Sequence, residues 1–321
     1  MGRYVLPEVP PLMRELYDRL AARFEAEWGP SSERARYADR YRKDFERTFT
    51  EVDLGRAPGL PPGLPGTPGL TLLEAQRPLA RYFAAFMLND SGEDLYSRLL
   101  KHLRQSRLIE RTLFASLNYE CLCEEAAMKL GLHVDYLLDA AAAALRRPSK
   151  ATDRKTGLPD RIRMAKLHGS SNFLTEIDQH YRAIVAAAST SLEVEVTALA
   201  LIDLQSNLES RFAATHGRES FPVMTQVSVG KEDILAPSQI QQIRNIWHES
   251  ASNAALVIVI GAAARRNDTH VWKALESAPG DVLYIGGDEQ FIEWKACNPR
   301  FRSLGLTFEQ AFLPLLSCLD S

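Results

Sequence analysis

The chain has few cysteines, no long apolar run and no excess of basic charge. Its 321 residues include four cysteines, too few for a disulfide scaffold and typical of a reducing compartment. The longest apolar run, 254–264, contains Gly261 and is shorter than the about 18 residues that a membrane span needs. The N-terminus lacks the basic and apolar layout of a signal peptide. We therefore expect a cytoplasmic protein without a membrane partner.

Charge and residue spacing exclude further classes. Lys and Arg number 38 against 41 Asp and Glu, and this net charge of −3 gives no reason to expect direct nucleic-acid binding. No His-x-x-x-His spacing occurs, and Cys121 and Cys123 have the wrong spacing for a zinc knuckle, so we interpret them as structural thiols. The sequence therefore predicts no metal site. Its apolar fraction of 45% is typical of a globular protein with a sizeable core.

Residues 1–110 have mainly the periodicity of helices. Apolar residues spaced by four predict a helix that ends at Trp28 and a second from Ser31 or Ser32 to about Phe49. Leucine and alanine spacing predicts two more helices, over 70–87 and 94–108. Residues 55–70 hold five prolines and five glycines, a density that predicts an exposed loop.

From Leu113 onward, short apolar runs alternate with helical patterns. The predicted strands are 113–117, 162–167, 221–227, 256–261, 282–285 and 305–307. Most of these runs are continuously apolar, which is typical of parallel strands buried on both faces. The sequence thus predicts an α/β fold in which residues 111–321 form a Rossmann-like parallel sheet with helices on both faces, after a helical N-terminal part.

Residues 174–215 fit two patterns. Leu192, Val194 and Val196 alternate as in a strand, whereas the wider apolar spacing from Ile177 to Ile202 fits two helices. We expect helices, with Ser191 as a possible cap, and therefore a helical insertion at about 174–215.

Polar residues and glycines follow four of the predicted strands. They are Asn118-Tyr119-Glu120, His168-Gly169-Ser170, Gly261-Ala262-Ala263 and Gly286-Gly287-Asp288. In a parallel sheet the carboxyl ends of the strands meet at one edge, where ligands bind. We expect an amide, an imidazole and several glycines to converge there.

Two of these strand ends resemble motifs of the sirtuin-like (silent-information-regulator type) NAD-consuming domains, especially the bacterial branch with NAD hydrolase members. Residues 117–120, Leu-Asn-Tyr-Glu, look like that branch's Asn-Tyr-Asp motif, and residues 166–170 look like its Lys-Leu-His-Gly-Ser motif. Residues 257–261 are similar to its third strand, which ends in glycine, and Asp268-Thr269-His270 resembles an Asp-x-His that often follows. The resemblance covers most of the chain and is tight at the first two motifs.

The resemblance implies an NAD+ hydrolase, with NAD as substrate and Asn118 and His168 as catalytic residues. An asparagine amide can orient a water or a ribose hydroxyl, and an imidazole can accept its proton. By the same resemblance, seven residues would contact the nucleotide: Tyr119, Glu120, Gly169, Ser170, Gly261, Ala262 and Gly286. Because such domains commonly act in bacterial antiviral defence, we expect an effector that forms a homo-oligomer or responds to an activating partner protein.

The chain also departs from this family. The family opens with a strand and a Gly-Ala-Gly-x-Ser loop that holds the NAD pyrophosphate, whereas this sequence opens with Met1-Gly2-Arg3-Tyr4-Val5. Either the sequence begins after that segment or the protein has lost it, and both alternatives lower the expected NAD affinity. Glu120 replaces the family's aspartate, and Ala263 stands where serine or threonine often follows the glycine.

Other interpretations stay open on the residues alone. His168 can be a strand-end histidine that binds a backbone carbonyl, and Asn118 or Asp268 can be a helix cap. A different class of function is a catalytically degenerate nucleotide-binding or assembly module without the phosphate-binding loop. A protein deacylase is disfavoured because the two Cys-x-x-Cys pairs of its zinc module are absent.

Overall fold

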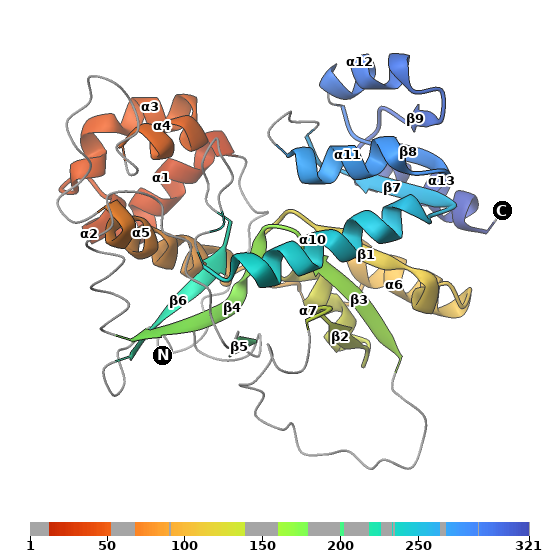
Figure 1. The fold of residues 1–321 in the computed structure, drawn as a ribbon, viewed down its shortest axis with the longest axis horizontal. Helices are drawn as coiled ribbons and strands as arrows, with labels where there is room; N and C mark the ends of the chain where they lie inside the picture. Colours follow the sequence, from red (N-terminus) through yellow and green to blue (C-terminus); the bar gives the residue numbers. More distant parts are fainter. Residues whose placement is uncertain are drawn as a thin grey trace, which may run out of the picture.

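The computed structural model describes most of the chain (Figure 1). The described residues are 13–52, 68–89, 91–138, 160–178, 200–201, 218–225, 233, 235–263, 268–287 and 289–320. They form a mixed α/β structure with a helical N-terminal region and three small sheets. In this part of the chain, no helix is both long enough and apolar enough to cross a membrane.

The N-terminal region is helical, as the sequence predicts. Its elements are α1 (Met13–Arg23), α2 (Glu25–Trp28), the 3-10 helix η1 (Glu33–Tyr37), α3 (Ala38–Lys43), α4 (Phe45–Val52), α5 (Pro68–Phe83), α6 (Leu95–Gln105) and the 3-10 helix η2 (Ile109–Arg111). The two longer helices predicted at the start are each interrupted, because Phe24 and Asp44 adopt non-helical backbone angles. The predicted loop 55–70 lies largely outside the described residues, and its last three residues begin α5.

Aromatic residues of the two helices predicted at the start form the core of this helical region. Trp28, Tyr41, Phe45 and Phe49 are at most 1% exposed. The rings of Trp28 and Phe45 stack with centroids 5.5 Å apart, and those of Tyr17 and Tyr41 with centroids 5.3 Å apart. Aromatic burial and stacking therefore stabilise these short helices, which would not persist alone.

The first sheet is parallel and has the order β1-β3-β2. It consists of β1 (Leu113–Ser116), β2 (His133–Asp135) and β3 (Arg161–Lys166), and α7 (Leu122–Lys129) lies between β1 and β2 in the sequence. β1 and β3 are the strands predicted before Asn118 and His168. Because they pair in parallel, with Ser116 opposite Lys166, their carboxyl ends lie side by side.

The second sheet is antiparallel, in the order β5-β4-β6, and was not predicted. It contains β4 (Gly169–Asp178), β5 (Ala200–Leu201) and β6 (Arg218–Met224). The prediction of helices over 174–215 is wrong at 174–178 and 200–201, since hydrogen bonding between β4 and its neighbours outweighs the helical spacing there. Residues 179–199 and 202–215 of that insertion lie outside the described residues.

The third sheet is parallel, in the order β7-β8-β9. Its strands are β7 (Leu256–Ile260), β8 (Asp281–Ile285) and β9 (Phe301–Ser303). The helices of this part are α10 (Pro237–Ser252), α11 (Thr269–Ser277), α12 (Glu289–Cys297) and α13 (Phe308–Leu319). The prediction of a strand at 305–307 is wrong. Gly305 has a φ of 60°, and the Thr307 side chain accepts a hydrogen bond from the Gln310 amide and so caps the first turn of α13.

The described strands therefore do not make one continuous Rossmann-like sheet. β3 and β4 belong to different sheets, and β4 pairs antiparallel with β6, which removes the strand predicted at 221–227 from the parallel arrangement. Helix α10 contacts β1, β3 and α11 and so lies between the first and third sheets (Figure 1). One large apolar core extends from the N-terminal aromatic residues through all three sheets.

Candidate functional site

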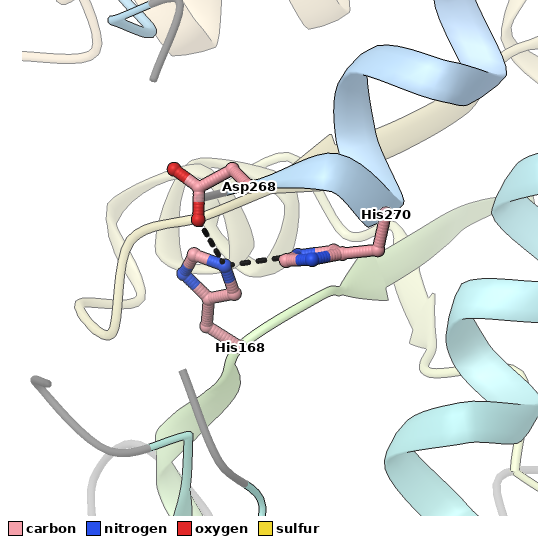
Figure 2. A group of neighbouring side chains, drawn as sticks. All are labelled: His168, Asp268 and His270. Carbon is pink, nitrogen blue, oxygen red and sulfur yellow. Dashed lines mark hydrogen bonds and ion pairs between the residues drawn. The ribbon is translucent and has the colours of Figure 1, made fainter. Parts of the chain in front are cut away.

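His168 lies between β3 and β4 and faces the start of α11. Its Nε2 atom is 3.0 Å from Nε2 of His270 and 3.4 Å from Oδ1 of Asp268 (Figure 2). His168 and Asp268 are both 5% exposed, and His270 is partly exposed. The imidazole that the sequence singles out thus belongs to a buried cluster of three ionisable groups.

Backbone contacts hold His168 in place from both sides. Its carbonyl oxygen accepts a hydrogen bond from the Thr225 amide at 2.8 Å, and the preceding Leu167 carbonyl accepts one from Arg244 Nε at 3.0 Å. Arg244 also binds the Thr225 hydroxyl and the Asp233 carboxylate. The main chain at the end of β3 is therefore anchored to α10 and to the residue after β6, which fixes the backbone that carries the imidazole.

Gly169 has a structural reason to be glycine. Its φ is +70°, and a Cβ atom there would overlap the Val223 carbonyl oxygen of β6. Ser170, the next residue, is fully buried, with its hydroxyl 3.4 Å from Cys121 Sγ and 3.5 Å from the Tyr119 carbonyl oxygen. Both residues were predicted to contact the nucleotide, and that role stays a prediction beside these contacts within the protein.

The Asn118-Tyr119-Glu120 segment follows β1 directly beside this turn. Asn118 Nδ2 donates to Glu120 Oε1 at 2.9 Å, and Glu120 Oε2 accepts from the Leu122 amide at 3.2 Å. The Glu120 carboxylate therefore orients the Asn118 amide and caps the first turn of α7.

Tyr119 is buried beneath the same turn. Its hydroxyl donates to the Thr225 carbonyl oxygen at 2.8 Å, and its ring centroid is 6.5 Å from that of His168. Burial, followed by the charges of Glu46 and Asp268, raises the pKa of Tyr119, so its hydroxyl stays a neutral donor. Tyr119 thus links the ends of β1, β3 and β6.

The predicted glycines lie at the carboxyl ends of β7 and β8. Gly261 has a φ of +65° and an open surrounding, and its amide donates to the Ile285 carbonyl at 2.9 Å. The Ala262 carbonyl accepts from the Tyr284 hydroxyl at 2.9 Å, and a Cβ on Gly286 would come within 2.9 Å of the Tyr284 ring. Gly261, Ala262 and Gly286 lie at one sheet edge. Asp268 and His270, which follow in the sequence after β7, contact His168.

The side chain of Asp268 has a different role from the helix cap that the sequence suggested. The backbone carbonyl of this N-cap residue accepts from the Val271 and Trp272 amides, but its side chain makes no capping hydrogen bond to α11, whose residues are all described. The side chain instead lies against His168. The interpretation of Asp268 as a side-chain cap is therefore wrong, and the Asp268-Thr269-His270 pattern after a strand end was the signal that could have found the cluster.

A buried ion pair between Lys166 and Glu124 lies beside the ends of β1 and β3. Lys166 Nζ lies 3.1 Å from Glu124 Oε1 and donates to the Glu120 carbonyl at 2.6 Å. Burial acts against the charge on Lys166, but Glu124, Cys121 and Glu120 outweigh it and raise the pKa of Lys166. Two charged side chains that are at most 1% exposed thus share the space under β1 and β3.

The thiols of Cys121 and Cys123 lie near this pair, whose charges act on them. Burial, then the Glu124 charge, raises the pKa of Cys121 to about 12, and burial likewise raises the pKa of Cys123 well above its ordinary value. A thiolate is the form that attacks electrophiles or binds metals, and these pKa shifts disfavour it. The interpretation of Cys121 and Cys123 as structural thiols stays a prediction, which these pKa directions favour.

Comparison with known protein families and with curated proteins finds no match for this chain.

Proposed function

We propose that the protein is a sirtuin-like NAD+ hydrolase that cleaves the nicotinamide–ribose bond. The observation that carries this proposal is the pairing of β1 with β3, because it places Asn118 and His168 at adjacent carboxyl ends of parallel strands. The first and third sheets, both parallel, together would serve as a Rossmann-like nucleotide-binding unit, with NAD bound at their carboxyl ends.

The groups present suit hydrolysis at the ribose C1′ atom. As nicotinamide leaves, positive charge develops on C1′, and a water adds there and gives up one proton. The Asn118 amide, held through Nδ2 by Glu120, would orient that water through its oxygen. The His168 imidazole would accept the proton, and the nearby Asp268 carboxylate would stabilise the resulting imidazolium. The products are nicotinamide, ADP-ribose and a proton.

The test is nicotinamide release from NAD+ by the purified full chain. His168→Ala should lower the rate by about 10²–10⁴-fold. A matched control is His102→Ala, since His102 of α6 also lies 3.0 Å from a carboxylate, that of Asp320 at the end of α13. Equal rates for the wild type and His168→Ala, with the chain alone and with its activating partner, would exclude the hydrolase.

The wider role is part of the same proposal. A hydrolase of this type would deplete cytoplasmic NAD, so its activity must be controlled, and assembly into a homo-oligomer or binding of an activating protein would supply that control. We propose a role as an effector of antiviral defence. Light scattering before and after activation should show a change of mass that accompanies nicotinamide release, and activity of an unassociated chain would contradict this control.

The burial of His168 favours a second candidate, a catalytically degenerate nucleotide-binding or assembly module. Its side chain is 6% exposed, and its Nε2 atom already contacts two side chains. Such a module would bind NAD weakly in calorimetry and release no nicotinamide under any condition. Turnover that depends on His168 would exclude it.

A further inference from the structure

The cluster formed by His168, Asp268 and His270 has the composition of a metal site. Two imidazole nitrogens and one carboxylate oxygen lie within 4.8 Å of one another (Figure 2). Two histidines and one carboxylate are the protein ligands of many catalytic zinc centres, in which water takes the fourth position. We propose that these three residues bind one divalent transition metal ion, with Zn²⁺ as the best-suited ion.

The distances support this assignment. A tetrahedral ion about 2.0–2.1 Å from each ligand atom separates the ligands by about 3.3 Å. His168 Nε2 is 3.0 Å from His270 Nε2 and 3.4 Å from Asp268 Oδ1, so two separations already match. The third is at most 4.8 Å, and rotation of the Asp268 carboxylate can shorten it. Binding thus requires a side-chain adjustment and no rearrangement of the fold.

The number of protons that Nε2 of His168 can carry also supports a metal site. An imidazole nitrogen carries at most one proton, so Nε2 of His168 can share a single hydrogen with the two atoms that approach it. A divalent cation would instead accept a lone pair from all three atoms at once.

The ligand set defines the chemical class of the ion. Imidazole is a poor ligand for Mg²⁺ and Ca²⁺, which take oxygen ligands, and it suits Zn²⁺, Fe²⁺, Ni²⁺ and Cu²⁺. His168 and Asp268 are buried, whereas His270 is partly exposed and offers a route for the ion to enter. The Asp268-Thr269-His270 pattern supplies two of the three ligands, but no sequence spacing links them to His168, which lies 102 residues before His270.

The backbone around the ligands is fixed before any ion binds. Thr225 and Arg244 hold the carbonyl oxygens of His168 and Leu167, and Asp268 begins α11. Ligands on anchored backbone lose little freedom on binding, which favours affinity. The site therefore differs from a chance meeting of surface side chains.

Direct titration of the metal-free full chain with Zn²⁺, in competition with a chromophoric chelator, tests the proposal. We expect one Zn²⁺ per chain, and at least about 100-fold weaker binding in His270→Gln and Asp268→Asn, because even indirect partners of a ligand change affinity 10–100-fold. His102→Gln, in the separate pair with Asp320, should keep the wild-type affinity. The absence of stoichiometric binding, or an affinity within about tenfold of wild type in both cluster variants, overturns the proposal.

Cobalt supplies a second measurement that does not depend on variant stability. Co²⁺ in a four-coordinate site with nitrogen and oxygen ligands gives visible absorption that is far stronger than that of the hydrated ion. The wild-type chain should develop this spectrum at one equivalent of Co²⁺ and lose it on addition of one equivalent of Zn²⁺. A spectrum of the hydrated ion at every ratio would count against the site.

One consequence rests on the proposed NAD+ hydrolase. If His168 is the base, an ion bound at Nε2 lowers the basicity of the imidazole and takes the Asp268 carboxylate that would stabilise the imidazolium, so Zn²⁺ should inhibit nicotinamide release and a chelator should restore it. Zn²⁺ binding without any nicotinamide release would refute the hydrolase and leave the metal site in place. Nicotinamide release that depends on His168 without Zn²⁺ binding would refute only the metal site.

Discussion

The Arg244 guanidinium donates through Nε to the carbonyl oxygen of Leu167, the residue that precedes His168, at 3.0 Å. The same guanidinium binds the Asp233 carboxylate, and the side chains of both residues are only 11% exposed. Helix α10 thereby anchors the end of β3 through a nearly buried ion pair. Pairs of this kind are costly to break, because the remaining charge keeps its desolvation penalty.

Arg244→Met tests this anchor. It keeps the apolar stem but leaves the Asp233 carboxylate without its cation, and we expect a loss of about 3–5 kcal/mol of unfolding free energy, measured by chemical denaturation. Arg302→Met is the matched control, because Arg302 and Asp281 pair at 2.8 Å with side chains that are 70% and 46% exposed. Its loss should stay below about 1 kcal/mol. Equal losses in the two proteins would mean that the Arg244 network does not stabilise the fold.

Two glycines of the candidate site, Gly169 and Gly261, have similar φ values and different surroundings, so their substitutions can be compared directly. Gly169 and Gly261 have φ values of +70° and +65°, but only Gly169 has a neighbouring carbonyl, that of Val223, where a Cβ would lie. Gly261→Ala should cost about 1–2 kcal/mol from the left-handed conformation alone. Gly169→Ala should cost clearly more, since β4 and β6 must also separate locally. Denaturation curves of both variants measure the difference, and similar losses would show that β6 moves away without cost.

The sequence located the strands of the site better than their arrangement. The strands predicted before Asn118, His168, Gly261 and Gly286 are β1, β3, β7 and β8, because short runs rich in apolar residues with glycine or polar ends are strong local signals. The strand after His168 was missed. Its first residues, Gly169 to Asn172, are small and polar and favour a loop, yet all are buried in β4.

Tertiary partners explain that miss. The Ser171 amide donates to the Tyr119 carbonyl, and Asn172 Nδ2 donates to the Tyr136 hydroxyl, in a segment more than 30 residues earlier in the sequence. A local pattern cannot reveal partners so distant, although they decide whether a polar residue can be buried. The contact of His168 with His270 escaped prediction for the same reason, since it depends on how α11 packs against the end of β3.

The Lys166–Glu124 pair predicts a characteristic pH dependence. Burial raises the pKa of Glu124 above its usual 4.5, and Lys166 opposes that rise. In Lys166→Met the opposing charge is gone, so the pKa of Glu124 in the folded state rises further. Because the unfolded chain then releases this proton at a lower pH than the folded chain, the variant should lose stability as pH rises from about 4.5 toward the folded-state pKa.

At neutral pH the loss in Lys166→Met should reach about 3–5 kcal/mol relative to the wild type, as for other broken buried pairs. Chemical denaturation at several pH values measures how the difference in unfolding free energy between the variant and the wild type grows as the pH rises. The double variant Lys166→Met with Glu124→Gln removes both charges, and it should recover much of the stability and show no such growth. A pH-independent difference in the single variant would mean that Glu124 is neutral in the wild type as well.

Asn118→Asp tests the amide that the proposed hydrolase requires. The new carboxylate would stand beside Glu120 Oε1, which now accepts a hydrogen bond from Asn118 Nδ2 at 2.9 Å, and two negative charges there would repel. We expect nicotinamide release to fall by about 10²–10⁴-fold, because the water loses its oriented partner.

Adding Glu120→Gln restores a neutral partner without restoring the amide, so it separates the charge repulsion from the loss of the amide. Recovery of the rate in this double variant would mean that orientation alone matters, whereas a persistent loss would assign the chemistry to the amide. Asn253→Asp, at the exposed end of α10, should leave the rate unchanged.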